Sequence, residues 1–94
     1  MSGEAALDRD ARLRRLRIRC WRRGTKEMDL ILGGFFDRRG ATLSDAALTE
    51  FEALIEEDDD RLYRWACGAE APPERHAAML ERIQRDSEVK RSDS

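Results

Sequence analysis

Residues 26–37 read KEMDLILGGFFD, and this stretch has a regular apolar pattern. Its apolar side chains recur at the i, i+3, i+4 and i+7 spacing that gathers them on one face of an α-helix. The side chains of this stripe are Met28, Ile31, Leu32, Phe35 and Phe36. The sequence therefore predicts a helix from Lys26 to Asp37 whose apolar stripe faces the core. At 100° per residue, Glu27, Leu30 and Gly34 lie within about 60° of one another beside the stripe, which favours a contact surface there.

The segments on either side of this stretch also predict helices. Leu7, Ala11 and Ile18 recur at helical spacing among arginines and predict a basic amphipathic helix before it, and Gly24 and Thr25 separate the two. A loop at 38–42 leads to Ser44, the predicted N-cap of a third helix. An acidic run, 56–60, ends that helix and caps a fourth, and a proline at 72 or 73 opens a fifth. The four flanking helices are predicted at about Ala5–Arg22, from Ser44 to the acidic run, at Arg61–Cys67 before the closing Gly68, and from the prolines to about Asp86.

These elements predict an all-α fold, a compact five-helix bundle in a single domain over residues 1–94. We expect an ordered core at about 6–86 and a flexible tail at about 87–94, because the last apolar stripe ends near Ile83. The predicted core consists of Met28, Ile31, Leu32, Phe35, Leu48, Phe51, Ile55, Leu62, Met79, Leu80 and Ile83.

Composition restricts the class of protein. Apolar residues make up 40% of the 94 residues and charged residues another 40%, which is too apolar for a disordered chain and too charged for a membrane one. No apolar run is long enough to cross a bilayer. The two cysteines, Cys20 and Cys67, stand far apart with no signal-peptide pattern before them, so we expect reduced thiols and a cytoplasmic protein.

The net charge of −2 conceals an uneven distribution. Residues 9–26 hold nine Arg and Lys against one Asp, and residues 41–74 hold ten acids against two Arg. These opposite charges either attract each other within the fold or leave a basic docking surface for an acidic partner. Nucleic-acid binding through the arginine-rich helix is the rival interpretation, but the acidic middle of the chain and a sequence pI near 5.5 argue against it.

Catalytic patterns are missing from the sequence. It contains no nucleotide-binding glycine loop, no HExxH, no nucleophile elbow and no Cys/His cluster. His76 lies on the apolar face of the last helix, which is typical of a core or edge histidine. The acidic run 56–60 lacks the ligand spacing of a calcium loop. We therefore expect no catalytic residue and no metal site.

The junction at 20–29, CWRRGTKEMD, concentrates residue types that are common at binding hot spots. Trp and Arg are enriched at such sites because each buries a large area and Arg offers directed donors. The alternative is that Trp21 packs into the core and Arg23 ties down a helix end.

At this junction, Arg23-Gly24-Thr25-Lys26-Glu27 resembles the RGxxE signature of the succinate dehydrogenase assembly factors, the flavinators. The flanking residues are similar to the family as well: MDLIL at 28–32, the Phe35-Phe36 pair, LSD at 43–45, and DDDRLYRW at 58–65. The resemblance covers about Arg15 to Gln84.

The resemblance implies a five-helix assembly factor, chaperone-like and not an enzyme. Such a factor binds the flavoprotein subunit of succinate dehydrogenase, and often of fumarate reductase, and promotes covalent attachment of FAD to a histidine of that subunit. The FAD belongs to the partner, so no stably bound cofactor is expected here. We also expect a monomer that neither binds nucleic acid nor inserts into a membrane; the alternative is a nucleic-acid-binding or other protein-interaction module that uses the first helix.

The resemblance also assigns the site residues. Gly24 makes the sharp turn that brings the backbone close to the partner, and Arg23 and Glu27 make polar contacts across the interface. The further candidates for partner binding are Trp21, Arg22, Lys26 and Leu30.

Overall fold

A computed structural model describes the backbone of residues 2–93 and the side chains of residues 8–86. This part of the chain is helical and contains no strand. In chain order the elements are α1 (Ser2–Trp21), α2 (Lys26–Met28), a π-helical turn (Asp29–Gly33), α3 (Gly34–Arg39), a 3-10 turn (Gly40–Thr42), α4 (Asp45–Ile55), α5 (Asp59–Cys67) and α6 (Glu74–Asp93). Because α2, the π turn and α3 follow one another without a break, the chain forms five helical segments, and the predicted all-α five-helix fold is confirmed.

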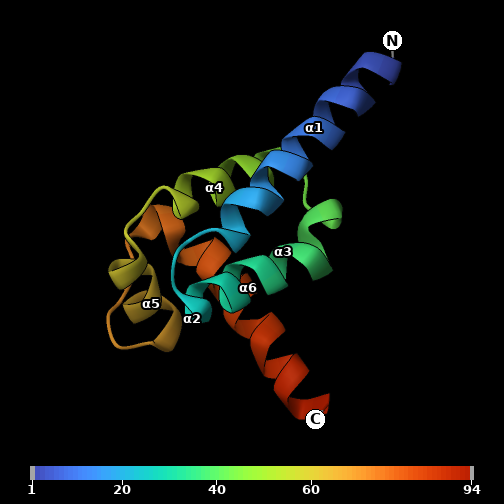
Figure 1. The fold of residues 1–94 in the computed structure, drawn as a ribbon. Coiled ribbons are helices and arrows are strands. Elements are labelled where there is room, and N and C mark those ends of the chain that lie inside the picture. The colour runs from blue at the N-terminus through green and yellow to red at the C-terminus, as the bar shows by residue number, and fades with distance from the viewer. Residues whose placement is uncertain (1, 94) are drawn as a thin grey trace.

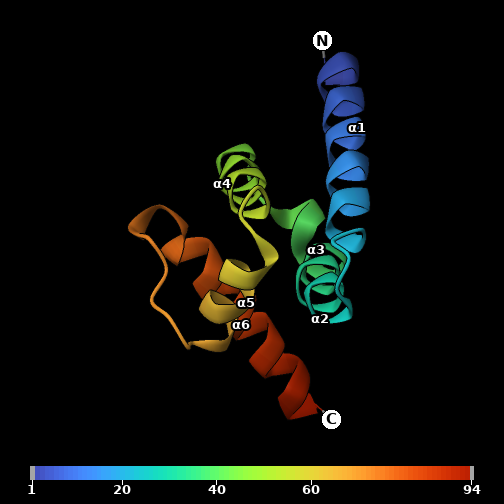
Figure 2. The same cartoon turned by 60° about the vertical axis from the view of Figure 1, so that its left-hand side comes forward.

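The helices form two layers. Figure 2 shows α1 with α2 and α3 on one side, and α4, α5 and α6 on the other. Contacts between α1 and α4, α2 and α5, and α3 and α6 join the layers. The start of α1 and the end of α6 extend from the body in opposite directions (Figure 1). The α1–α2 turn therefore lies at an edge of the first layer, next to α5.

The core lies between the layers, and three phenylalanines form its centre. The rings of Phe36 and Phe51 stack with centroids 5.3 Å apart, and Phe35 lies 5.9 Å from Phe51. Every predicted core residue is buried except Ile31, which packs against the core and stays half-buried. The core also takes in Leu16 and Cys20 from α1, together with Leu43, Leu54 and Trp65. Ile18, which sequence analysis placed among the apolar positions of the first helix, is instead 53% exposed.

The predicted helix starts and stops are largely confirmed. The hydroxyl of Ser44 accepts from the backbone N–H of Ala47 at 3.1 Å, as an N-cap does. Gly68 ends α5 with φ +81°, the left-handed conformation that glycine adopts readily. Pro73 comes directly before α6. Local sequence signals therefore placed most of the helix ends.

Four boundaries differ from the prediction. The helix predicted to end at Asp37 continues to Arg39, and a 3-10 turn at Gly40–Thr42 follows where a loop was predicted at 38–42. The first helix begins at Ser2, the fourth begins at Asp59, and α6 continues to Asp93 where the prediction ended near Asp86. The apolar stripe ends at Ile83, but residues 87–93 contain no glycine or proline to stop a helix. The side chains from residue 87 on and Ser94 lie outside the described residues, and the flexibility of this tail stays a prediction.

Candidate functional site at the turn between α1 and α2

A turn around Gly24 separates the first helix from the second. Gly24 has φ +99°, a conformation that residues with a side chain rarely adopt, although a Cβ at this position would meet no atom within 4 Å. The turn is fixed from both sides. The backbone N–H of Arg23 donates to Oδ1 of Asp29 at 2.9 Å, and the hydroxyl of Thr25 accepts from the N–H of Met28 at 3.4 Å. The backbone conformation, rather than lack of space, therefore requires glycine here.

The side chain of Arg23 faces into the protein. Its Nε donates to Oδ1 of Asp59 at 2.7 Å, and its Nη atoms donate to the backbone oxygens of Ile55 and Glu57, the latter at 2.8 Å. These acceptors lie at the end of α4 and the start of α5. The side chain is only 12% exposed, so its guanidinium is used mainly within the fold. The alternative drawn from the sequence, that Arg23 ties down a helix end, describes its geometry.

Glu27 is exposed and borders a groove. The groove has a volume of about 390 Å³ and lies between the start of α2 and α5. Asp60 and the half-exposed ring of Tyr63 line its other side. Glu27 can therefore accept hydrogen bonds from a molecule that approaches this face.

Trp21 and Leu30 are two large apolar side chains left exposed near the turn. Leu30 is 54% exposed, and Trp21, at the end of α1, is 37% exposed. The indole of Trp21 lies against Gly33, so closely that a Cβ on Gly33 would come within 2.5 Å of it. Trp21 is thus neither a core residue nor a free surface residue, because one face is covered and the other is open to a partner.

The strip predicted beside the stripe is partly present. Glu27 and Leu30 are exposed, as the prediction of a contact surface requires. Gly34 is not bare, because the guanidinium of Arg38 lies against it, 3.1 Å from where a Cβ would stand. The π turn at Asp29–Gly33 also changes the helical register between Leu30 and Gly34. The contact strip therefore ends before α3.

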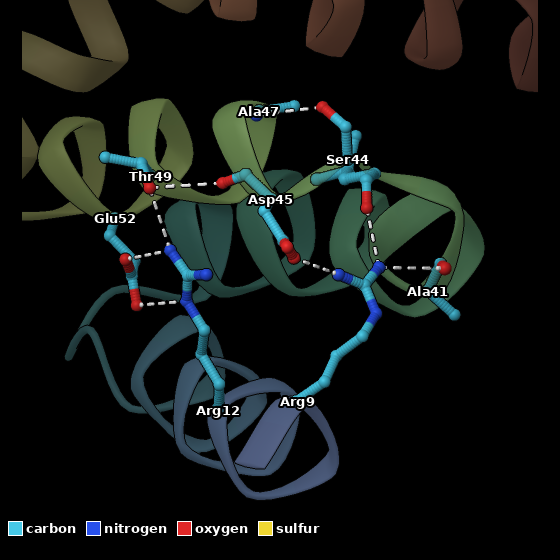
Figure 3. Close-up of polar contacts among 9 residues, drawn as sticks. Arg9, Arg12, Ala41, Ser44, Asp45, Ala47, Thr49 and Glu52 are labelled. Atoms are coloured by element: carbon cyan, nitrogen blue, oxygen red, sulfur yellow. Dashed lines mark hydrogen bonds and ion pairs between the residues drawn. The ribbon is translucent and has the colours of Figure 1, made fainter. Parts of the chain in front are cut away.

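Most of the basic residues in α1 pair with acids of the same chain. Figure 3 shows Arg9 and Arg12 extending from α1 towards the start of α4. Arg9 bonds Asp45 at 2.8 Å, and Arg12 holds both carboxylate oxygens of Glu52 through Nε at 3.1 Å and Nη2 at 2.6 Å. The hydrogen bond from Arg12 lowers the pKa of Glu52.

Three further arginines of the basic segment also form ion pairs within the fold. These pairs are Arg17–Asp37, Arg19–Glu56 and Arg23–Asp59. The basic positions that remain exposed include Arg22 and Lys26, which flank the turn, and Arg14 and Arg15. Five of the nine cations of residues 9–26 therefore form ion pairs within the fold, as the first interpretation of the charge asymmetry requires. A basic docking surface made by the others stays a prediction.

His76 and the two cysteines lie in surroundings that serve the fold. His76 is 1% exposed, as expected of a core histidine, and its Nε2 lies 2.9 Å from Oε2 of Glu57. Hydrogen bonds from His76 and Arg75 lower the pKa of Glu57. Cys20 and Cys67 are free thiols, one buried and one exposed. Within the described residues, no three His, Cys, Asp or Glu side chains gather as a metal site would need, and no helix combines the length and apolarity needed to cross a bilayer.

Sequence reasoning missed two features of this surface. It did not single out Tyr63, which is 45% exposed beside Glu27, or Ile18, which it read as part of an apolar face. A signal was present for Ile18: Leu16 and Cys20 are four residues apart, and Ile18 lies half a turn from both, on the opposite side of the helix. Tyr63 carried no comparable signal.

Comparison with known proteins places the chain in a family. The family model described as the flavinator of succinate dehydrogenase matches residues 14–87. The chain is 38% identical to an FAD assembly factor SdhE from Acetobacter pasteurianus, with 96% of this chain and 84% of the relative covered. A second FAD assembly factor SdhE, from Xylella fastidiosa, is 34% identical over 82% of this chain and 78% of its own length.

A relative from mitochondria also matches the chain. A mitochondrial succinate dehydrogenase assembly factor 2 from Mycosarcoma maydis is 35% identical over 73% of this chain and 29% of its own length. No solved structure matches the chain. The family match spans the turn, the π-containing helix and the groove beside Glu27, so the chain belongs to the family of succinate dehydrogenase flavinators.

Proposed function

We propose that this chain binds the flavoprotein subunit of succinate dehydrogenase, and of fumarate reductase, and promotes covalent attachment of FAD to a histidine of that subunit. Membership of the flavinator family supports this function. The observation that carries it is the surface at the α1–α2 turn, where Glu27 and Leu30 are exposed and Trp21 is held half open against Gly33. An exposed carboxylate beside large apolar side chains suits a protein interface.

Each residue of this surface has a proposed part in binding. Leu30 and the open face of Trp21 bury apolar area against the subunit, and Glu27 accepts hydrogen bonds from it. Arg22 and Lys26 attract acidic groups to the turn. The positive φ of Gly24 lets the partner approach the backbone closely. Arg23 positions the turn from inside the fold, and its direct contact with the partner stays a prediction of the motif.

In this proposal the factor supplies orientation and the partner supplies the reactive groups. Covalent flavinylation joins a histidine of the partner to the flavin that the partner holds. By binding the subunit in the geometry where these groups meet, the factor removes several kcal/mol of barrier without providing a nucleophile or base of its own. The chain is then an assembly factor and not an enzyme.

The test compares Glu27→Ala and Leu30→Ala with Glu50→Ala, a control that removes an exposed carboxylate from α4. Covalent flavin on the succinate dehydrogenase flavoprotein is measured by in-gel fluorescence, in cells that lack their own assembly factor and carry each variant. We expect the two turn variants to lose most of the flavinylation and the control to keep it. Thermal melts should place all three within about 1 kcal/mol of the parent, as for surface sites. Full flavinylation with both turn variants would contradict the assignment.

Nucleic-acid binding by the basic segment has less support, because five of the nine cations of residues 9–26 already pair with acids of the same chain. Fluorescence anisotropy with labelled duplex and single-stranded DNA at physiological salt separates the two functions. Weak binding is expected. A sub-micromolar affinity that falls steeply with salt would favour the rival function.

A further inference from the structure

A second groove lies at the far end of the helix that begins with the motif. It has a volume of about 230 Å³ and runs between the end of α3 and the second half of α6. Both ribbon views show α6 passing close to α3 before the chain ends (Figure 1, Figure 2). The fourteen residues from Lys26 to Arg39 span about 20 Å at 1.5 Å per residue. This groove is therefore separate from the surface at the α1–α2 turn.

The groove combines an apolar floor with a cationic rim. Phe35 and Leu43 line it from the core, and the guanidinium groups of Arg39, Arg82 and Arg85 surround it. Asp86 is the only acid among the residues that line it. Three cations against one carboxylate give the groove a net positive charge.

The carboxylate of Asp86 is already occupied. Its Oδ2 accepts from Nε of Arg38 at 2.6 Å, and its Oδ1 accepts from Nε of Arg39 at 3.1 Å. Arg39 donates only its Nε–H to Asp86, and a guanidinium has five N–H donors. Its remaining donors form no hydrogen bond with a described residue, and they can bind a second carboxylate.

The two rim arginines of α6 have donors available as well. Arg82 is exposed and forms no ion pair with any described side chain, and Arg85 is paired through one Nη with the exposed Glu81, one turn earlier on the same helix. Guanidinium groups bind carboxylates in a planar, two-pronged geometry. Among the described residues, the rim thus has more donors than the acids around it use.

The volume limits what the groove can hold. A site of about 230 Å³ is smaller than the roughly 300–1,000 Å³ of pockets that enclose a cofactor or drug-sized ligand. It suits one or two side chains of an extended peptide. The apolar floor favours a ligand that carries an apolar group directly beside its anionic group. An acidic peptide with a neighbouring large apolar residue has both groups, whereas a bare phosphate has only the charge.

We propose that the groove formed by Phe35, Leu43, Arg39, Arg82 and Arg85 binds an acidic peptide segment of a partner protein, with a carboxylate between the guanidinium groups and an apolar side chain on Phe35 and Leu43. This inference goes beyond the proposed function, because it adds a second contact at the opposite end of the helix from the motif. A factor that binds its partner at two separate sites holds the partner in a more defined orientation.

The test is an NMR titration of the full 15N-labelled chain with three short peptides. Acetyl-Glu-Glu-Leu-Phe-amide carries both the charge and the apolar residues, the Gln-Gln-Leu-Phe analogue lacks the charge, and the Glu-Glu-Ser-Ser analogue lacks the apolar side chains. We expect only the first peptide to shift the amides of Thr42, Leu43 and residues 82–86 strongly. Arg82→Ala should weaken its binding about tenfold, the value of one charged hydrogen bond. The control Arg14→Ala, which removes an exposed arginine from α1, should leave binding unchanged.

The same spectra show whether each variant is folded. Equal shifts from the charged and uncharged peptides, or shifts centred on the exposed arginines of α1, would overturn the proposal. So would phosphatidylserine vesicles or a DNA oligonucleotide that shift the groove amides at lower concentration than the acidic peptide. Glu27→Ala should bind the peptide as the parent does, so a failure at this groove is distinguishable from a failure of the proposed function.

Discussion

The guanidinium of Arg23 joins three segments of the chain. It extends from the α1–α2 turn to the last carbonyl of α4, the carbonyl of Glu57 and the carboxylate of Asp59 at the start of α5. The carbonyls at a helix end have no partner inside the helix, so a fixed cation there satisfies them and favours the helix dipole. The arginine of the RGxxE motif thus holds the turn that presents Gly24 and Glu27.

Replacing Arg23 with Ala should therefore destabilise the fold. The change leaves Asp59 and two carbonyls without their donor in a place where the arginine side chain is only 12% exposed. We expect a loss of about 2–4 kcal/mol, since removing one partner of a buried pair costs about 3–5 kcal/mol and this pair is partly solvated. Urea unfolding measures the loss. Arg22→Ala is the matched control, and its exposed side chain should change the stability by less than about 0.5 kcal/mol. Equal effects of the two variants would refute the structural part given to Arg23.

The two thiols should differ sharply in reactivity. Burial raises the pKa of Cys20 to about 12, and its side chain is fully enclosed in the core. The reactive species is the thiolate, so Cys20 should stay inert at neutral pH. Cys67 is exposed at the end of α5. Titration with Ellman's reagent should find one fast thiol in the native chain and a second only in denaturant, and Cys67→Ser should abolish the fast reaction. Two fast thiols in the native chain would contradict this burial.

At the scale of the elements, the packing of α1 on the π turn depends on a missing side chain. The indole of Trp21 fills the space where a Cβ of Gly33 would stand, at 2.5 Å. The backbone of Gly33 has φ −64°, so alanine would suit the helix itself. The requirement for glycine therefore comes from close packing and not from backbone conformation.

This packing predicts opposite effects at two adjacent glycines. Gly33→Ala should displace Trp21 and destabilise the chain by about 1–3 kcal/mol, the usual result of overpacking. At Gly34 a Cβ would meet only the mobile end of Arg38, at 3.1 Å. Gly34→Ala should thus be neutral or stabilise by up to about 1 kcal/mol through helix propensity. Thermal melts and acrylamide quenching of tryptophan fluorescence compare the two variants with the parent. We expect stronger quenching than in the parent for Gly33→Ala only. Identical melts for the two variants would rule out a tight fit of Trp21 on Gly33.

The apolar periodicity of the sequence predicted the helices well, but it did not predict the π turn or the contacts of individual side chains. The stripe from Met28 to Phe36 lies in the core because apolar spacing reports directly on which face is buried. The π turn carried no signal, because one extra residue in a helical turn leaves a similar pattern in the sequence. The burial of Arg23 was hidden too, since its acceptors include two backbone carbonyls more than thirty residues away.

At the scale of the whole molecule, opposite charges join the helices. Pairs from Arg9, Arg12 and Arg19 fasten α1 to α4 and its end, and Asp86 of α6 holds two arginines at the end of α3. The sequence displayed the opposite charges but not their pairing, because the partners are more than thirty residues apart. The unequal distribution of charge therefore indicated that the helices attract one another, but it did not indicate where the functional site lies.

These pairs predict how the stability depends on pH. Burial alone would raise the pKa of Asp86, but its bonds to Arg38 and Arg39 outweigh burial and lower it; the pKa of Glu52 is lowered by Arg12. The unfolded chain, with carboxyl pKa values of about 3.9 for Asp and 4.3 for Glu, therefore takes up protons before the folded chain does. The stabilisation is complete above these values and is lost as the pH falls through the lower folded-state pKa values.

Asp86→Asn isolates one such pair. The variant should be less stable than the parent at pH 7, because Arg38 and Arg39 lose their carboxylate in a site where Asp86 is 6% exposed. The difference should shrink as the pH falls below about 4, because the unfolded parent then takes up a proton on Asp86 that the folded parent resists. Urea unfolding from pH 7 to 3 measures both chains, and Glu50→Gln, which alters an exposed acid, should follow the parent throughout. A gap between Asp86→Asn and the parent that stays constant over this range would mean that Asp86 stabilises the fold by packing and neutral hydrogen bonding rather than by its charge.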